Sequence, residues 1–557
     1  MKPARLRTTT AAVGVVASLL LASACSSSPN ADNGKAGRGS GVLNIGTASG
    51  PQTENNNPYL NTSSALGVGY ASVTFETLAL VNPIRPADKP KPWLATDWSW
   101  SPDLRSITLT VRDGVTWSDG KPFSAQDVAF SFGLMKKFPA LNGAGVPYKD
   151  IKVDGDKVVL GFDAPQFVNE SNILSLFVVP QHIWASQADP TTFTNPKPVG
   201  TGPYVLDRFA PQSIVLKRRD DYWQKAPRVA ELHYTTYNDN TGLTTALASG
   251  AVEWGWAPIP DIKGVYLSKD PKHHHGWFPA ALGANGLWLN NERGPFKNKA
   301  LRQAAGLVTD RKLIATEGQY GLVPPIENPT GIPLPAGESF LAPEYKSAKL
   351  TVDVDKARKI LTGAGYTYRG STLIDPSGKP VEVTLTDPAG WADYLADLDI
   401  IKSGLQKIGV KATIKTQSAD SWSQAFNNGD FDATMHWTNG GASPYDMYAN
   451  IMSGAAYKPV GTSAQNNQGR YRNAEVDAAL KAYVTATDTA ARTAALAVLQ
   501  RRMAEDVPAI LTHANAIGGE YSTKHWVGWP SETDPYAPPQ PVQRTAVDVV
   551  LHLRPAT

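Results

Sequence analysis

Apolar residues recur along this chain with two periods, one of two residues and one close to four, and the two patterns alternate. Residues 107–112 (ITLTVR) alternate strictly and end at Asp113-Gly114, which predicts a β-strand that meets a turn. Residues 124–127 (SAQD) have the spacing of a capping box. We therefore expect a helix to begin there and to continue to about Lys137.

The same two patterns continue through the rest of the chain. Helices are predicted over residues 355–363, 397–408, 474–486 and 489–505, and strands over 42–46, 381–385 and 411–415. Interleaved strands and helices predict an α/β architecture. Residues 322–343 contain six prolines and two glycines, so we expect a long surface loop or crossing segment there.

The N-terminus has the pattern of an export signal. Three basic residues within residues 1–7 precede an apolar run, residues 11–22, that is too short to span a bilayer as a helix. We predict a signal peptide over residues 1–24; the alternative is a buried N-terminal helix.

Cys25 is the only cysteine, so no intrachain disulfide can form. A lone cysteine at this place resembles the lipobox of bacterial lipoproteins, which implies that Cys25 becomes the lipidated first residue of the mature chain. The lipobox usually has Leu three residues before the cysteine, where this chain has Ala22, and Leu21 lies one place earlier. The alternative is an incidental cysteine. Residues 25–40 have almost no apolar side chains and are predicted to be a lipidated, flexible tether.

Size and charge narrow the class of protein. A length of 557 residues predicts two or three domains, and a hydrophobic content of 42% is that of a folded globular chain. Residues 1–24 hold three basic and no acidic residues, so the mature chain has 50 of each sign. A neutral chain offers no electrostatic basis for binding nucleic acid.

No enzyme motif can be assembled from the sequence. It contains no GxSxG, GxxxxGK or HExxH pattern. His273-His274-His275 is the one metal-like cluster, but three adjacent side chains do not readily converge on an ion, so we expect a solvated loop there and no metal. Scattered carboxylates leave a surface glycoside hydrolase as an alternative of another class. We predict no catalytic residues and no cofactor.

Several blocks occur in a family's order along most of the mature chain. They are residues 92–98 (PWLATDW), 109–123 (LTVRDGVTWSDGKPF), 198–204 (PVGTGPY), 219–223 (RDDYW), 289–291 (LNN), 295–296 (PF), 301–304 (LRQA), 405–410 (LQKIGV) and 429–432 (GDFD). Together they resemble the family 5 extracellular solute-binding proteins of ABC importers, the oligopeptide, dipeptide and nickel group. Most of these blocks also have a structural interpretation, such as turns at Asp113-Gly114 and Asp119-Gly120.

The resemblance implies an α/β, two-lobed periplasmic-binding-protein fold of type II, cluster C. Lobe I would comprise residues 41–85, 199–285 and 521–557, an extra domain residues 86–198, and lobe II residues 286–520. It implies capture of a ligand by hinge closure and delivery to the permease subunits of an ABC importer. We expect a monomer held by its lipid on the outer, extracytoplasmic face of the cytoplasmic membrane.

The ligand class depends on a short stretch that starts at Trp437. Peptide-binding members commonly hold the ligand ammonium with an aspartate in a Trp-x-x-Asp-x-x-x-Pro pattern. That register runs here from Trp437 to Pro444 and places Gly440 at the aspartate position. A buried ammonium without a carboxylate is costly, so the peptide anchor is missing unless Asp446 or another acid substitutes.

A carbohydrate instead needs flat aromatic faces and uncharged amides or hydroxyls. The candidates for these contacts are Trp254, Trp256, Trp437, Asn439, Gly440 and Tyr448, followed by Asn55, Tyr70, His513 and Asn515. Any one of the fifteen tryptophans is more often a packing residue. Family positions single out Trp256 and Trp437.

A second resemblance concerns residues 526–536 (WVGWPSETDPY) and the small run GGASP, residues 440–444. Both look like segments of the cello- and manno-oligosaccharide-binding branch of the family. We therefore predict an oligosaccharide ligand, with an oligopeptide as the alternative.

Overall fold

The computed structural model describes residues 41–60 and 62–557. The predicted signal peptide, Cys25 and the tether lie outside these residues. Within the described part of the chain, no helix is both long and apolar enough to cross a membrane. Residues 38–557 form one compact unit by their internal contacts.

A seven-stranded sheet forms the first lobe. Its strand order is β12 (His274–Trp277), β20 (Gly519–Ser522), β11 (Trp254–Gly255), β1 (Val42–Thr47), β10 (Glu231–Thr236), β9 (Ser213–Arg218) and β8 (Tyr204–Ala210). β1 is parallel to both β10 and β11, so segments from both ends of the chain share one sheet. The accompanying helices are α1 (Ser64–Val68), α2 (Ala71–Thr74), α6 (Asn240–Ser249), α7 (Ile262–Val265) and α16 (Ala546–His552).

An inserted region carries its own antiparallel sheet. The order is β4 (Ala95–Trp100), β5 (Ser106–Val111), β7 (Lys157–Gly161) and β6 (Asp150–Asp154), with α3 (Ala125–Lys137), α4 (Glu170–Leu174) and α5 (Gln181–Trp184) beside it. The predicted strand and helix near residues 107 and 125 are confirmed as β5 and α3. The backbone N–H of Ser124 donates to Asp127 Oδ2 at 2.9 Å, which is one half of the predicted capping box.

A five-stranded sheet forms the second lobe. Its order is β17 (Lys411–Gln417), β16 (Glu382–Pro388), β18 (Ala433–Trp437), β13 (Ala280–Leu289) and β19 (Ala509–Ala516). Its main helices are α8 (Lys299–Val308), α10 (Val354–Gly363), α11 (Ala392–Lys407), α12 (Ala419–Asn428), α13 (Tyr445–Met452), α14 (Ala474–Thr485) and α15 (Thr489–Asp506). Two clusters of buried apolar side chains pack against this sheet.

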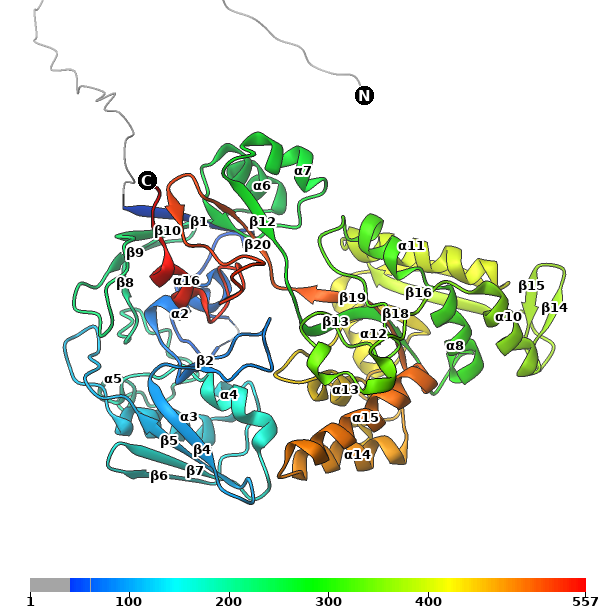
Figure 1. Cartoon of the computed structure of the whole chain (residues 1–557), viewed down its shortest axis with the longest axis horizontal. Helices are drawn as coiled ribbons and strands as arrows, with labels where there is room; N and C mark the ends of the chain where they lie inside the picture. The colour runs from blue at the N-terminus through cyan, green and yellow to red at the C-terminus, as the bar shows by residue number, and fades with distance from the viewer. Residues whose placement is uncertain (1–40, 61) are drawn as a thin grey trace, which may run out of the picture. The chain divides into compact units, whose positions relative to one another are not determined.

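Two adjacent segments connect the first sheet to the second. β12 runs on into β13, and β19 runs on into β20, as Figure 1 shows. Trp277 pairs with Gly519 on one side of the crossing and Ala280 with Ala516 on the other, while the Ile517 N–H donates to the Pro279 carbonyl at 3.0 Å. We propose this crossing as the hinge, which would move the lobe borders to residues 278–279 and 517–518.

Most predicted elements of the second lobe are confirmed, with two differences. Helix α11 begins at Ala392, five residues before the predicted start, because Asp397 is fully buried and interrupts the apolar stripe that marks a helix face. Residues 322–343 form no α-helix or strand, as predicted. The expected surface position is wrong for part of this segment, since Ile326, Ile332 and Leu341 pack into the core.

The predicted solvated loop at the three histidines is also wrong. His274 and His275 lie in β12, and His274 is buried, with its ring stacked on Tyr266 at a centroid distance of 4.3 Å. His275 stacks on Tyr521. Successive side chains of a strand point to opposite faces, so neighbouring histidines diverge instead of meeting at one ion.

Three of the family blocks meet at one buried arginine. The guanidinium of Arg219 donates to the carbonyls of Gly200, Gly202 and Trp117 at 3.3 to 3.4 Å. A Cβ at Gly200 would lie only 1.9 Å from the Thr74 carbonyl oxygen, so two backbone segments touch where a side chain cannot fit. These blocks therefore hold the fold together.

Candidate functional site

Two of the fifteen tryptophans are exposed to solvent. Trp437, the last residue of β18, is 43% exposed, and Trp256, which follows β11, is 42% exposed. The other thirteen, all within the described residues, are half-buried or buried. The two that family positions singled out are thus the two whose rings can receive a ligand.

Trp437 is supported from behind by other aromatic rings. Its ring stacks on His436 at a centroid distance of 4.0 Å, and His436 in turn stacks on Trp422 and Phe426. Trp391 lies 6.1 Å from Trp437. Burial lowers the pKa of His436 to about 4, so the imidazole is neutral at pH 7. The result is a fixed, uncharged aromatic platform.

Asn439 places an amide beside this platform. Its backbone N–H donates to Asn450 Oδ1 at 3.0 Å, and its Nδ2 donates to Asn466 Oδ1 at 3.2 Å. Asn450 Nδ2 also donates to Asn466 Oδ1, at 2.7 Å. The side chain of Asn439 is exposed, and within the described residues its Oδ1 accepts no hydrogen bond. It can therefore accept one from a ligand hydroxyl.

Gly440 lies against another glycine. A Cβ at Gly440 would be 3.3 Å from the backbone nitrogen of Gly283 and 3.6 Å from its Cα. A Cβ at Gly283 would in turn lie 3.2 Å from Asn515 Nδ2. The structure thus brings Asn515, a half-buried residue of β19, close to the Gly440 backbone, although 75 residues separate them in the sequence.

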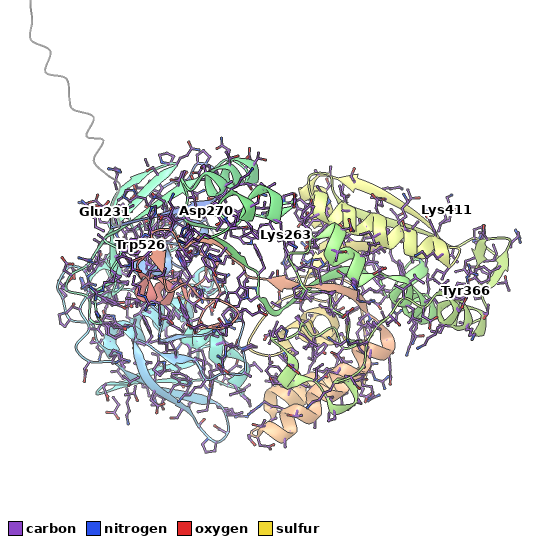
Figure 2. All side chains as sticks on the ribbon, turned by 45° about the horizontal axis from the view of Figure 1, so that its top comes forward. Glu231, Lys263, Asp270, Tyr366, Lys411 and Trp526 are labelled. Atoms are coloured by element: carbon purple, nitrogen blue, oxygen red, sulfur yellow. The ribbon has the colours of Figure 1, made fainter. Side chains whose placement is uncertain are left out.

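Trp254 lies in the core of the first lobe. Its ring is fully buried, packs at 5.4 Å against Trp529, and donates through Nε1 to the Pro539 carbonyl. Trp526 is also buried, as Figure 2 shows, and donates through Nε1 to the Val42 carbonyl at 3.1 Å. These tryptophans of the 526–536 segment pack the first lobe, so we leave Trp254 out of the proposed ligand contacts.

Asn55 and Tyr70 belong to one buried polar network. The Tyr70 hydroxyl donates to Asn56 Oδ1 at 2.7 Å, and Asn55 Oδ1 accepts the Asn57 N–H at 3.1 Å. Asn57 Nδ2 donates to the Phe193 carbonyl at 2.8 Å, which ties the loop to the inserted region. With their polar atoms used inside the protein, these residues are better explained as loop supports.

Tyr448 and His513 are likewise inside the second lobe. Tyr448 is fully buried and its hydroxyl donates to the Thr330 carbonyl at 2.9 Å. His513 is 1% exposed, and burial lowers its pKa to about 3. Neither side chain reaches solvent in this structure, so neither is kept among the proposed contacts.

Two buried carboxyl groups beneath the platform have no sequence signal. Burial raises the pKa of both Asp387 and Asp397 to about 8. Asp387 Oδ2 accepts the Met435 N–H at 2.9 Å, and Asp397 Oδ2 accepts Gln319 Nε2 at 3.0 Å. Asp397 Oδ2 also lies 3.9 Å from His513 Nδ1, but the pKa shifts of both groups favour their neutral forms. The interior below Trp437 therefore carries little charge at pH 7.

The Asp397→Asn variant is expected to gain stability relative to the unchanged chain as pH rises from 5 to 8.5. Between its ordinary pKa and about 8, the folded chain keeps a proton that the unfolded chain has lost, so stability falls with rising pH. Asparagine does not ionise and can still accept from Gln319. We expect a gain of about 1 to 3 kcal/mol, measured by urea unfolding.

Asp399→Asn is the matched control, because Asp399 lies on the same helix with 71% of its side chain exposed. It should show no such gain. An unchanged pH slope in Asp397→Asn would mean that this carboxyl does not titrate as its burial requires.

Two cavities border the small-residue run and the crossing segments. One of about 490 Å³ is lined by Trp98, Phe167, Ala442, Ser443 and Asp446, and a second of about 650 Å³ by Trp277, Phe278 and Glu532. Residues 85–88 line both. Burial raises the pKa of Asp446 to about 7, and its carboxylate packs over Gly441. Residues from both lobes thus enclose space next to the 440–444 run.

Two sheets joined by paired crossing strands, with a third sheet inserted in the first lobe, define the type II class of two-lobed solute-binding proteins. The sequence profile of bacterial extracellular solute-binding proteins, family 5, matches residues 89–459. The chain belongs to this family, whose members are extracytoplasmic solute-binding receptors of ABC importers.

Individual relatives differ in what their names say they bind. A probable peptide-binding protein YejA of Agrobacterium fabrum is 26% identical over 466 residues, which cover 73% of this chain and 74% of the relative. The oligopeptide-binding protein AppA of Bacillus subtilis is 25% identical over 422 residues, covering 72% and 74%. The nickel-binding periplasmic protein of Escherichia coli is 24% identical over 382 residues, covering 65% and 69%.

Solved structures show the same fold. A periplasmic oligopeptide-binding protein of Thermotoga maritima superposes with a TM-score of 0.82 at 24% identity, covering 92% of this chain and 99% of that one. Its mannohexaose-bound structure gives a TM-score of 0.73, covering 92% and 98%. Bacillus subtilis AppA with a bound nonapeptide gives 0.68 at 19% identity, covering 93% and 99%.

Proposed function

We propose that this receptor captures a cello- or manno-type oligosaccharide between its lobes and delivers it to the permease of its ABC importer. The observation that carries the proposal is the exposed face of Trp437, backed by neutral rings and flanked by Asn439 and Gly440. Trp256 supplies a second exposed ring from the first lobe.

Each part of this surface suits a neutral sugar better than a peptide terminus. Sugar C–H groups pack on flat aromatic faces, and sugar hydroxyls pair with amides such as Asn439 and Asn515. Gly440 provides no carboxylate for an ammonium. His436 is neutral at pH 7 and so provides no positive charge for a carboxylate terminus.

Closure at the crossing segments would bring a second lobe onto the bound ligand. A ligand favours the closed form only by contacts that it makes there and lacks in the open form. The lipid at Cys25 would hold a monomeric receptor at the outer face of the membrane, next to its permease. Because nothing is consumed in capture and release, the proposed function needs no catalytic residue and no cofactor.

The fold alone does not choose between ligand classes, since related structures hold mannohexaose in one case and a nonapeptide in another. One observation favours an oligopeptide as the second candidate. Asp446 lies six residues beyond Gly440, borders the 490 Å³ cavity and forms no ion pair among the described residues. A ligand ammonium would supply the missing positive charge.

Thermal unfolding with a panel of ligands tests the proposal. A ligand that binds only the folded chain stabilises it by about 2.7 kcal/mol at one hundred times its Kd. We expect cello- or manno-oligosaccharides to raise the melting temperature, and a peptide mixture at equal concentration to leave it unchanged.

The same panel separates the alternatives. Stabilisation by peptides alone would overturn the sugar proposal, and its loss in Asp446→Asn would identify Asp446 as the ammonium partner. A glycoside hydrolase would convert the bound oligosaccharide during long incubation, whereas a receptor returns it intact.

A further inference from the structure

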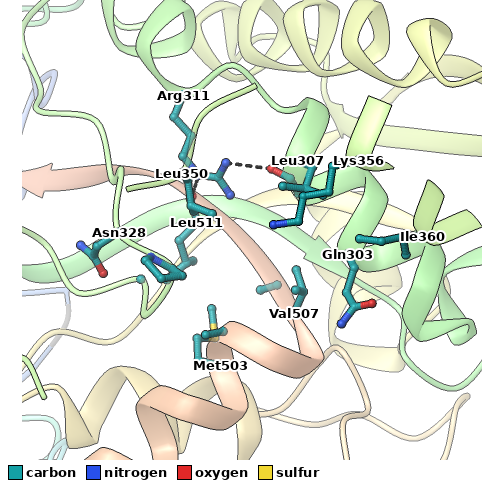
Figure 3. A pocket seen from close by; sticks show the side chains of 15 residues that line it. Gln303, Leu307, Arg311, Asn328, Leu350, Lys356, Ile360, Met503, Val507 and Leu511 are labelled. Carbon is teal, nitrogen blue, oxygen red and sulfur yellow. Dashed lines mark hydrogen bonds between the residues drawn. The ribbon is translucent and has the colours of Figure 1, made fainter. Parts of the chain in front are cut away.

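A second pocket lies within the second lobe and is lined by residues other than the proposed sugar contacts. It has a volume of about 270 Å³ and is formed by α8, α10, the end of α15, β19 and residues 328–331. Its wall is mainly apolar, with Leu307, Ile360, Met503 and Leu511 among the lining residues (Figure 3). Such a size is near the lower end for small-molecule sites.

Arg311 brings a buried positive charge to this pocket. Its side chain is more than nine-tenths buried, and its Nε donates to the Leu511 carbonyl at 2.8 Å. Nη1 donates to the carbonyls of Gly306 at 2.9 Å and Thr309 at 3.3 Å. In the described residues, Nη2 has no hydrogen bond and no carboxylate lies within ion-pair distance of the guanidinium. A buried cation without an anion is unfavourable, and burial accordingly lowers the Arg311 pKa to about 10.

Lys356 adds a second cation at the same place. Figure 3 shows its ammonium and the Arg311 guanidinium pointing into the same space. Lys356 also has no ion pair among residues 41–60 and 62–557. Two like charges that face one space repel each other, and one anion placed between them would satisfy both.

We propose that this pocket binds a small organic acid. Its carboxylate would lie between Arg311 Nη2 and Lys356 Nζ, and its apolar body would pack against Leu307, Ile360 and Met503. This site goes beyond the transport of an oligosaccharide, because it involves none of the residues proposed to contact the sugar.

Calorimetric titration of the full chain with octanoate tests the proposal, with octanol and inorganic phosphate as matched probes. Octanol carries the apolar body without the charge, and phosphate carries charge without the apolar body. We expect octanoate to bind at least about tenfold more tightly than either, since each lacks one of the two contacts. Equal affinity for octanol or for phosphate, or no binding of octanoate, would overturn the proposal.

Two variants locate the binding. Lys356→Gln should weaken octanoate about fivefold, while Lys359→Gln, on the same helix but outside the pocket lining, should not change it. Ala504→Leu should fill the pocket and weaken octanoate at least about tenfold, with an unchanged melting temperature as the check on folding. Equal effects of the two lysine variants, or loss of octanoate binding in Trp437→Ala, would place the acid elsewhere and contradict the proposal.

Discussion

Trp437→Ala is expected to weaken oligosaccharide binding by about 30- to 150-fold while it lowers the free energy of unfolding by no more than about 1 kcal/mol. The fold-change corresponds to about 2 to 3 kcal/mol, the scale of a central aromatic contact. The small stability cost follows from the 43% exposure of the ring, which leaves little buried area to lose. Calorimetric titration and urea unfolding measure the two quantities.

Trp422→Ala is the comparison, because Trp422 lies in the same aromatic stack but is 4% exposed. Its truncation should cost about 3 to 5 kcal/mol of stability, as for other buried aromatics. If Trp437→Ala loses stability and affinity to the same extent, Trp437 is a packing residue. If its affinity is unchanged, the ligand does not lie on this ring.

Gly440→Asp is expected to weaken oligosaccharide binding at least about tenfold. A Cβ there already presses on the Gly283 backbone at 3.3 Å, so the carboxylate must extend into the exposed space beside Asn439. Closure over a sugar would then desolvate an unpaired charge, which is costly. Titration with the best oligosaccharide of the ligand panel measures the change.

Gly440→Ala and Gly440→Asn separate the causes of this effect. Alanine reports only the contact with Gly283, and we expect a loss below about threefold. Asparagine has the volume of aspartate without its charge, so the difference between these two variants isolates the charge. Affinity that none of the three changes would show that the ligand lies away from Gly440.

Local signals predicted the elements whose sequences agree with their surroundings. The helices α14 and α15 and the strand β5 match their predicted spans within a residue or so, because period and capping are local properties. The start of α11 was missed because a buried carboxyl at Asp397 looks like a solvent-facing residue in the sequence. The histidine run was misread because His274 pairs with Ser522, almost 250 residues away.

The sequence by itself determined the family, the α/β class and the absence of a carboxylate at position 440, because ordered blocks and residue identities need no coordinates. Only the tertiary structure decided which aromatic rings face solvent. Trp254, Tyr70 and Tyr448 are buried by segments distant in the chain, and Trp437 remains exposed with Trp391 and Trp422 near its ring. Exposure depends on which strands become neighbours, and no local period encodes that.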